Sequence, residues 1–369
     1  MPRYAPPVTP LADRLAARTL ELVDIPSESR HEEQIREHLL TLVPPTLSPE
    51  YAHDEAYLFV PARRPGAPLV VLAGHYDTVP AQGNLPGRID GGVVHGLGTS
   101  DMKGGLAVAI EIVRDLAAHG PGQYDVALLL FGREELPVEH DPLPALFSGS
   151  SAVHETALAI VLEPTDGTIQ AGCLGNVVAR LTFHGTSGHS ARPWLADNAI
   201  GRAVEGLVPL LAIEARETIV AGLTFVEVLS VTRFEAGIAD NVIPGEATAT
   251  VNHRYPPDRT PAEAEAYLRS LVPERATLEI VSNAPPARVV TDSALVLGLR
   301  DAGGLKIEPK QAWTNVADFA ANGIDAVNFG PGHTAYAHRR DELVEVGALV
   351  RAYETLHRFL AGGIREGAA

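Results

Sequence analysis

Residues 68–80 read PLVVLAGHYDTVP and residues 98–105 read GTSDMKGG, and these two stretches decide the fold. The apolar run that opens the first stretch predicts a buried strand that ends just before His75. The second stretch leads into a predicted helix. Open α/β sheets bind ligands at the carboxyl ends of their strands. His75, Asp77 and Asp101 therefore occupy positions typical of a functional site rather than of a core.

Strands and helices alternate in the first part of the chain. Runs of consecutive apolar residues indicate strands that are buried on both faces, as in a mostly parallel sheet with helices on each side. Glu134, Glu135 and Glu163 each follow such a run closely. The expected elements are helices over residues 11–23, 35–43 and 105–118 and strands over 68–73, 125–131 and 157–162.

After Cys173 the order of predicted elements becomes β-α-β-β-α-β, which is typical of a ferredoxin-like domain. Its strands are expected over 177–183, 224–233, 246–254 and 276–281, and its helices over 198–216 and 261–272. Alternation then resumes, with helices over 294–300, 316–321 and 342–360 and strands over 307–313 and 324–329. We therefore predict a discontinuous α/β catalytic domain, residues 1–173 and 285–369, and an inserted α+β domain, residues 174–284.

The composition is that of a globular protein with a strong excess of negative charge. Of 369 residues, 46 are acidic and 29 basic, which gives a formal net charge of −17 and argues against a nucleic-acid partner. No apolar run approaches the ~18 residues of a membrane-spanning helix. The first ten residues, MPRYAPPVTP, do not resemble a secretory signal. The single cysteine, Cys173, excludes an intramolecular disulfide and a Cys-rich zinc site. We expect a cytoplasmic protein with no membrane partner.

Metal-capable side chains collect at the predicted strand ends. Imidazole and carboxylate donors without thiolate suit zinc, cobalt or manganese in a hydrolytic site. More than four donors indicate two ions, which need a bridging carboxylate and can activate one water. Of two adjacent glutamates, one can bind metal while the other serves as a general base. The candidate donors are His75, Asp77, Asp101, Glu134, Glu135, Glu163, His333 and His338.

Six segments occur in an order that resembles the dinuclear zinc aminoacylase/carboxypeptidase family, peptidase family M20. They are HYDTVP (75–80), GTSDMKGG (98–105), the pair Glu134-Glu135, VLEPT (161–165), GTSGHSARP (185–193) and GPGHTAYAHRRDE (330–342). The order is most similar to succinyl-diaminopimelate desuccinylases of the actinobacterial type, in which an NLP segment, here 84–86, separates the first two motifs. The resemblance covers nearly the whole chain. It implies a zinc exopeptidase-like catalytic domain and a homodimer formed through the inserted lid domain.

The resemblance also implies a set of metal ligands. Two Zn²⁺ per chain would be bound, with Co²⁺ and Mn²⁺ as alternative ions. Asp101 would bridge both ions, and the Asp101–Met102 peptide is expected to be cis. The remaining ligands would be His75 and Glu163 for one ion and Glu135 and His338 for the other.

Further roles follow from the same resemblance. Glu134 would take a proton from the water and pass it to the leaving amine, and Asp77 would orient His75. His189 would stabilise the tetrahedral oxyanion; in dimeric relatives it reaches the site of the other subunit. The inserted domain is therefore expected to close over the metal domain. The positions that match substrate-binding residues are Asn241, Arg254 and Thr314.

Two positions depart from the family pattern. Arg133 precedes the glutamate pair, where the family usually has a polar or acidic residue or cysteine. If its side chain points inward, it would hold Glu134 ionised and lower its basicity. Asp318 precedes Phe319, where similar desuccinylases tend to carry an arginine that can pair with a substrate carboxylate. An anion at that position would repel a carboxylate and favour an ammonium group.

The expected activity is hydrolysis of the amide bond of a small N-acyl amino acid. The predicted substrate is N-succinyl-LL-2,6-diaminopimelate, cleaved to succinate and diaminopimelate in lysine and diaminopimelate biosynthesis. Alternatives within the class are acetylornithine deacetylase-like activity and dipeptidase or carboxypeptidase activity. A different alternative is a non-catalytic homologue that binds an amino-acid derivative in the same cleft. Such a homologue would have lost a ligand or Glu134, and all six residues are present.

Overall fold

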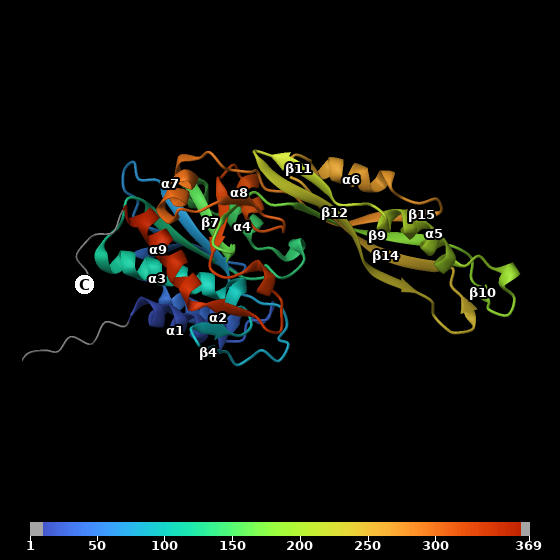
Figure 1. The fold of residues 1–369 in the computed structure, drawn as a ribbon, viewed down its shortest axis with the longest axis horizontal. Helices are drawn as coiled ribbons and strands as arrows, with labels where there is room; N and C mark the ends of the chain where they lie inside the picture. The colour runs from blue at the N-terminus through green and yellow to red at the C-terminus, as the bar shows by residue number, and fades with distance from the viewer. Residues whose placement is uncertain (1–9, 363–369) are drawn as a thin grey trace, which may run out of the picture. The chain divides into compact units, whose positions relative to one another are not determined.

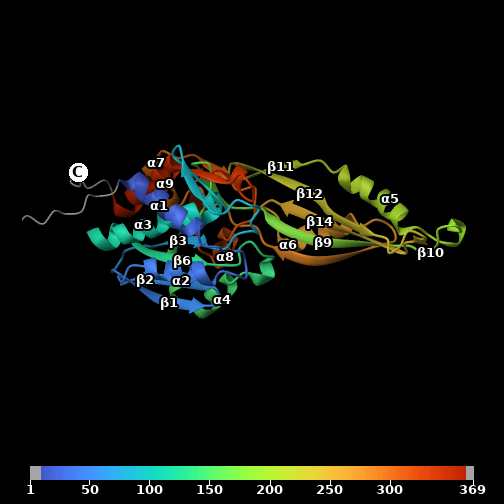
Figure 2. The same cartoon turned by 90° about the horizontal axis from the view of Figure 1, so that it is seen from below.

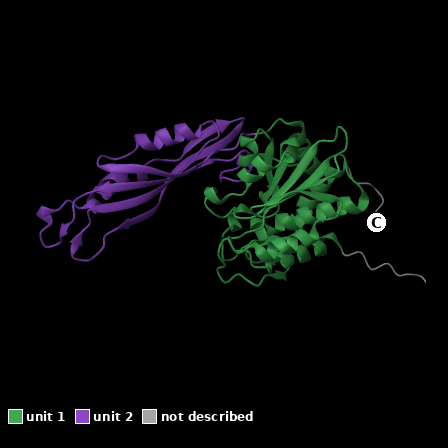
Figure 3. Ribbon diagram, turned by 180° about the vertical axis from the view of Figure 1, so that it is seen from behind, with its two compact units in different colours: residues 1–171, 290–308, 318–369 green, residues 172–289, 309–317 purple. Residues whose placement is uncertain are grey.

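The computed structural model describes residues 10–362 and divides them into two compact units (Figure 3). Unit 1 comprises the described residues up to Ala171, Val290–Glu308, and those from Asp318 onward; unit 2 comprises Gly172–Val289 and Pro309–Ala317. The sequence analysis placed 309–317 with the catalytic domain. In the structure Gln311 accepts a hydrogen bond from the Val226 N–H at 3.1 Å and donates to the Thr224 carbonyl at 3.2 Å, so this segment packs with unit 2.

An eight-stranded mixed sheet forms the centre of unit 1 (Figure 1). Strands β6, β3, β7 and β17 run parallel, whereas β1 and β2 are antiparallel. Because every residue of β3 and β6 is buried, both faces are covered at the centre of the sheet, as predicted. In spatial order the strands are β1 (Leu47–His53), β2 (Ala56–Pro61), β6 (Asp125–Phe131), β3 (Leu69–His75), β7 (Thr156–Pro164), β17 (Ala326–Gly330), β8 (Ile169–Ala171) and β16 (Ile307–Pro309).

The helices of unit 1 pack in two groups (Figures 1 and 2). Helix α9 contacts α1, α3 and α7, α1 also contacts α3, and α3 lies on β3, β6 and β7. Helices α4 and α8 meet through an edge-to-face contact of Phe147 and Phe319. The helices are α1 (Leu11–Val23), α2 (Glu33–Leu42), α3 (Gly104–His119), α4 (Leu143–Gly149), α7 (Ala294–Gly303), α8 (Val316–Ala321) and α9 (Val346–Ala361), with the short turns η1 (Thr99–Lys103), η2 (Val138–His140), η3 (Ala152–Glu155) and η5 (Thr334–Tyr336). Within residues 10–362, no helix has the length and apolar character that crossing a membrane requires.

A small three-stranded sheet completes unit 1 and brings two distant segments together. Its order is β18 (Leu343–Glu345), β5 (Val93–His95) and β4 (Arg88–Asp90). The sequence analysis expected one closing helix over 342–360. The structure instead pairs Leu343 with His95 before α9 begins, because the apolar side chains there complete a sheet formed by a segment far away in the sequence.

Unit 2 has the predicted ferredoxin-like order with one added edge strand. Its sheet runs β11 (Arg216–Val220), β12 (Leu223–Ala236), β14 (Glu246–Tyr255), β9 (Gly175–His184) and β15 (Ala276–Ala284). Helices α5 (Ala199–Leu211) and α6 (Pro261–Ser270) cover one face through a common apolar core. A two-stranded ribbon joins β10 (Gly188–His189) to β13 (Val242–Ile243), and η4 (Pro193–Leu195) lies beside it. The helix predicted over 198–216 was too long: it ends at Leu211, and Arg216 already begins β11.

Candidate metal centre

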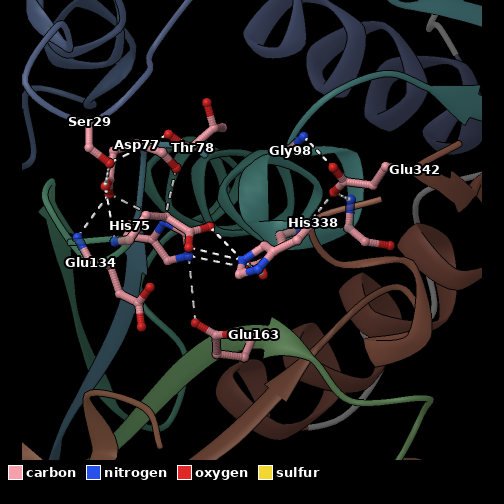
Figure 4. A network of polar contacts seen from close by, with 12 residues as sticks. Ser29, His75, Asp77, Thr78, Gly98, Glu134, Glu163, His338 and Glu342 are labelled. Atoms are coloured by element: carbon pink, nitrogen blue, oxygen red, sulfur yellow. Dashed lines mark hydrogen bonds and ion pairs between the residues drawn. The ribbon is translucent and has the colours of Figure 1, made fainter. Parts of the chain in front are cut away.

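Three neighbouring parallel strands deliver the predicted donors to one edge of the unit 1 sheet (Figure 4). His75 is the last residue of β3, and Glu163 is the residue before the end of β7. Glu134 and Glu135 follow β6, and Asp101 lies in η1, just before α3. The Asp101–Met102 peptide is cis, as expected. The carboxyl ends of β6, β3 and β7 therefore bring together residues that are up to 88 positions apart, from His75 to Glu163.

The first group of ligand atoms lies around His75. Its Nε2 is 3.1 Å from Asp101 Oδ1 and 3.6 Å from Glu163 Oε1. Burial opposes a positive charge on the ring, but the hydrogen bonds to Asp101 and Asp77 outweigh it and raise the pKa of His75 well above its usual value. His75, Asp101 and Glu163 thus offer three ligand atoms within 4.8 Å of one another.

The second group shares Asp101 with the first. His338 Nε2 is 2.9 Å from Glu135 Oε2 and 3.5 Å from Asp101 Oδ2. Hydrogen bonds that the protonated ring donates to Asp101 and Glu135 raise the pKa of His338 to about 11. Because one oxygen of Asp101 faces His75 and the other faces His338, its carboxylate has the geometry of a bridge between two ions. His333, the other loop histidine, pairs instead with Asp166.

Asp77 holds the neighbouring loops in place rather than offering a ligand atom. Its side chain is fully buried; Oδ1 accepts the Glu134 N–H and Oδ2 the Glu135 N–H, both at 3.1 Å. Ser29 Oγ donates to it at 2.6 Å. His75 Nδ1 lies 3.1 Å from the Asp77 carbonyl and 3.4 Å from its carboxylate, which leaves Nε2 free for a metal.

Glu134 lies beside both groups, within 4.8 Å of ligand atoms of His75 and Glu135. Burial, and then the charges of Glu163, Glu135 and Asp101, raise its pKa well above the usual value, although the charge of His75 opposes this. The main influences on the pKa of Glu134 are its burial and the charges of the other site residues, whereas the charge of Arg133 is one of those that act on the pKa of Tyr57.

The donors fit a pair of divalent cations. Four carboxylates, those of Asp101, Glu134, Glu135 and Glu163, face two imidazoles, those of His75 and His338. This concentration of negative charge, together with an oxygen and nitrogen donor set without thiolate, suits zinc, cobalt or manganese.

Glu342 is a residue of this site that the sequence analysis missed. It was expected to begin the closing helix, but its buried carboxylate accepts the N–H groups of Gly98, Ser100 and Asp101 at 2.8, 2.9 and 3.0 Å. Burial raises the pKa of Glu342 to about 7. The carboxylate thereby fixes the turn that carries Asp101. The only signal in the sequence was its place in the AHRRDE segment, four residues after His338.

The remaining predicted residues belong to unit 2. His189 and Asn241 lie together there, because β10 pairs with β13 and the Ser190 N–H donates to the Asn241 carbonyl at 3.0 Å. Thr314 is buried in the segment that packs with this unit. Arg254 is half-buried, and its Nε donates to Asn252 Oδ1 at 3.0 Å. Within the described part of the chain, no carboxylate lies within 4.0 Å of the Arg254 guanidinium, and burial lowers its pKa.

Known proteins share this sequence pattern and fold. The model of peptidase family M20/M25/M40 matches residues 71–362. A succinyl-diaminopimelate desuccinylase of Corynebacterium glutamicum is 36% identical over 354 residues, which cover 91% of this chain and 94% of that protein. The aminopeptidase PepT of Bacillus cereus superimposes with a TM-score of 0.77 at 18% identity, covering 95% of this chain and 98% of that one. The YXEP protein of Bacillus subtilis, a dinuclear metal binding peptidase from the M20 family, superimposes with a TM-score of 0.68 at 16% identity, covering 94% and 97%. These two structures confirm the predicted fold class.

Proposed function

The chain belongs to peptidase family M20/M25/M40 and is a hydrolase that acts on amide bonds, and from this premise we propose that it removes the succinyl group from N-succinyl-LL-2,6-diaminopimelate. The products would be succinate and diaminopimelate, in lysine biosynthesis. The observation that carries the proposal is the pair of three-residue ligand groups that share Asp101, with Glu134 beside them. The desuccinylase of Corynebacterium glutamicum, similar over 91% of the chain, supports the choice of substrate.

In this proposal His75, Asp101 and Glu163 hold one Zn²⁺, and Asp101, Glu135 and His338 hold the other. When bound, the two ions polarise the scissile carbonyl and activate a water. Glu134 takes the proton of that water and gives it to the leaving amine. Burial, and then the negative charges of Glu163, Glu135 and Asp101, raise the pKa of Glu134, and two bound cations would balance those charges.

His189 is proposed to stabilise the oxyanion by donating a hydrogen bond. The Ala191 N–H donates to His189 Nδ1 at 3.1 Å. A neutral imidazole with Nδ1 as acceptor carries its proton on Nε2, so this nitrogen is the available donor. The ring is exposed, and a donor on such a loop can meet a negative charge as it develops.

Arg254 and Asp318 are proposed to recognise the charged groups of the substrate. Arg254 is a half-buried cation without a carboxylate partner in the described residues, and a substrate carboxylate would supply one. Asp318 lies half-buried on α8. N-succinyl-diaminopimelate carries a free ammonium group at the end opposite its succinyl group, and an anion at Asp318 would favour that ammonium.

Unit 2 carries a surface that supports the proposed homodimer. One face of α5 exposes four aliphatic side chains, which are between 37% and 66% exposed, at helical spacing. They are Ile200, Val204, Val208 and Leu211. Val208→Asp should convert a dimer to a monomer in light scattering. Thr277→Asp, on β15 and outside this aliphatic face of α5, should not. A wild-type chain that is monomeric at micromolar concentration would refute the homodimer.

Glu134→Gln tests the proposed reaction. The variant should lose at least about 1,000-fold in kcat, because no other carboxylate is free to move the proton, and it should still bind two zinc ions per chain. Retained turnover would overturn the role of Glu134. A panel of N-succinyl, N-acetyl and dipeptide substrates tests specificity. Preference for an N-acetyl or dipeptide substrate would overturn the desuccinylase assignment, and inactivity on all of them would favour a binding protein.

A further inference from the structure

His338 differs from His75 in how the protein holds it. The His75 side chain is fully buried and contacts Asp77 through its second ring nitrogen, whereas the His338 side chain is 54% exposed. Among residues 10–362, no hydrogen-bond partner is found for His338 Nδ1. Histidines that bind metal normally have such a partner, which fixes the orientation of the ring. Apart from the contacts of Nε2 with Glu135 and Asp101, neither burial nor a hydrogen bond at Nδ1 within the described residues orients the His338 ring.

The backbone of His338 is also in an uncommon conformation. Its φ is +61°, in the left-handed region that residues other than glycine rarely adopt. A side chain attached to such a residue leaves the chain in a different direction from one on an extended or right-handed backbone. Conformations of this kind persist where neighbouring contacts hold them. The direction of the imidazole toward Glu135 thus depends on whatever holds the His338 backbone.

Two side chains from the loop after HYDTVP supply that contact. Gln82 Nε2 donates to the His338 carbonyl at 3.0 Å, and Asn84 Nδ2 lies 3.4 Å from the Arg339 carbonyl. Asn84 also shapes its own loop: Oδ1 accepts the Gln82 N–H at 3.0 Å, and its carbonyl accepts the Leu97 N–H at 3.2 Å. Asn84 thereby presents Gln82 to His338.

We propose that Gln82 is a positioning residue for His338, holding its backbone so that the imidazole meets Glu135 and Asp101 at the second metal site. The proposal rests on the proposed metal centre. Without the amide donor, the His338 carbonyl can turn and the residue can relax out of the left-handed region. Loss of a residue that positions a metal ligand typically weakens metal binding by about 10- to 100-fold. Only the ion held by His338 would be affected, because in the described part of the chain the Gln82 side chain makes no hydrogen bond to His75, Asp101 or Glu163.

The test is a zinc titration of the full chain against a competing chelator. Gln82→Met keeps the length of the side chain and removes the donor; Gln34→Met is the matched control, because Gln34 is an exposed residue of α2. We expect Gln82→Met to weaken the second zinc ion about 10- to 100-fold and to leave the first within about twofold, while Gln34→Met matches the wild type. In a His338→Ala background, Gln82→Met should have no further effect, because the side chain that it positions is gone.

Three outcomes would overturn the proposal. Binding of both ions by Gln82→Met as tightly as by the wild type would show that the hydrogen bond does not position His338. Equal weakening of both ions, with a lower melting temperature of the metal-free protein, would show a general structural role. Failure of the wild-type chain to bind a second ion would refute the proposed metal centre itself, and this result is distinguishable because it appears without any substitution.

Discussion

Replacing Asp77 with asparagine tests whether one buried carboxylate organises both loops of the candidate site. Asp77 Oδ1 accepts the Glu134 N–H, and Oδ2 accepts the Glu135 N–H and the Ser29 hydroxyl. Hydrogen bonds and the charge of His75 outweigh burial and lower the pKa of Asp77, so the carboxylate is ionised at neutral pH. Asparagine has the same shape but only one acceptor oxygen.

The expected loss can be worked from these contacts. The NH2 group of Asn cannot accept a hydrogen bond, so either the Glu134 N–H or the Glu135 N–H loses its partner in a buried position. A buried donor without a partner costs about 1–3 kcal/mol. The Ser29 hydroxyl can rotate and accept from the new amide, so it adds little. Because Glu134 and Glu135 are displaced together, zinc affinity should fall about 10- to 100-fold, which corresponds to about 1.4–2.7 kcal/mol.

Urea unfolding of the metal-free protein, followed by circular dichroism, measures the loss of stability caused by the unpaired N–H group. Fluorescence would miss it, because both tryptophans, Trp194 and Trp313, lie in unit 2. A zinc competition assay measures the loss of zinc affinity, and kcat measures the effect of the displaced glutamates on turnover. Ser29→Ala is the control, because it removes one hydrogen bond to the same carboxylate and leaves both loop N–H groups satisfied. An Asp77→Asn variant with stability within about 0.5 kcal/mol of the wild type and unchanged zinc affinity would refute the reasoning.

Three further predictions concern charge and metal. Arg254→Gln should raise KM for N-succinyl-diaminopimelate by about 10- to 100-fold, since it leaves a substrate carboxylate unpaired; an unchanged KM would exclude this contact. Glu227 has a lowered pKa, because hydrogen bonds from His253 and Arg216 outweigh its burial, so its stabilising effect is present above about pH 4.3 and is lost as the pH falls through its lowered folded value. Glu227→Gln should therefore destabilise unit 2 at pH 7, and its difference from the wild type should shrink as the pH falls through the lowered folded pKa, as measured by tryptophan fluorescence; a difference that does not shrink on acidification would contradict this. A chelator should remove one zinc ion per chain before the other, because His338 is exposed and His75 is buried; loss of both ions in one phase would contradict this order.

Local patterns were enough to predict several elements of the fold. Helix α1 and strand β6 have the predicted bounds, because a clear helical period or a continuous apolar run is limited by polar residues at each end. The closing helix was predicted over 342–360 but begins later, because Leu343–Glu345 first completes a sheet with β5. That pairing depends on residues about 250 positions away. Helix α5 ended early because the chain turns after Leu211 to form the edge strand β11.

The donors of the candidate centre, in contrast, left a clear trace in the sequence. Only histidine, cysteine and acidic residues bind zinc strongly, which gave eight candidates at predicted strand ends and in the late loop, and the resemblance to the family reduced these to five expected ligands. The structure brings all five of these side chains and Glu134 to one edge of the sheet. Their roles as ligands and base remain proposals, which the zinc titration and the Glu134→Gln variant test.

Residues that position the donors leave a weaker trace in the sequence, for a physical reason. A metal selects the type of its ligand, whereas a backbone N–H or carbonyl accepts any polar side chain that reaches it. Asp77 was identified because it lies two residues from His75, within the same motif. Glu342 and Gln82 act on backbone groups more than 240 positions away, so residue type did not point to them, and the only trace of Glu342 was its place after His338 in the AHRRDE segment. The two halves of the centre therefore differ in what holds their histidines. His75 is held by Asp77, a residue of its own segment, whereas His338 is held by residues that come close to it only once the chain has folded.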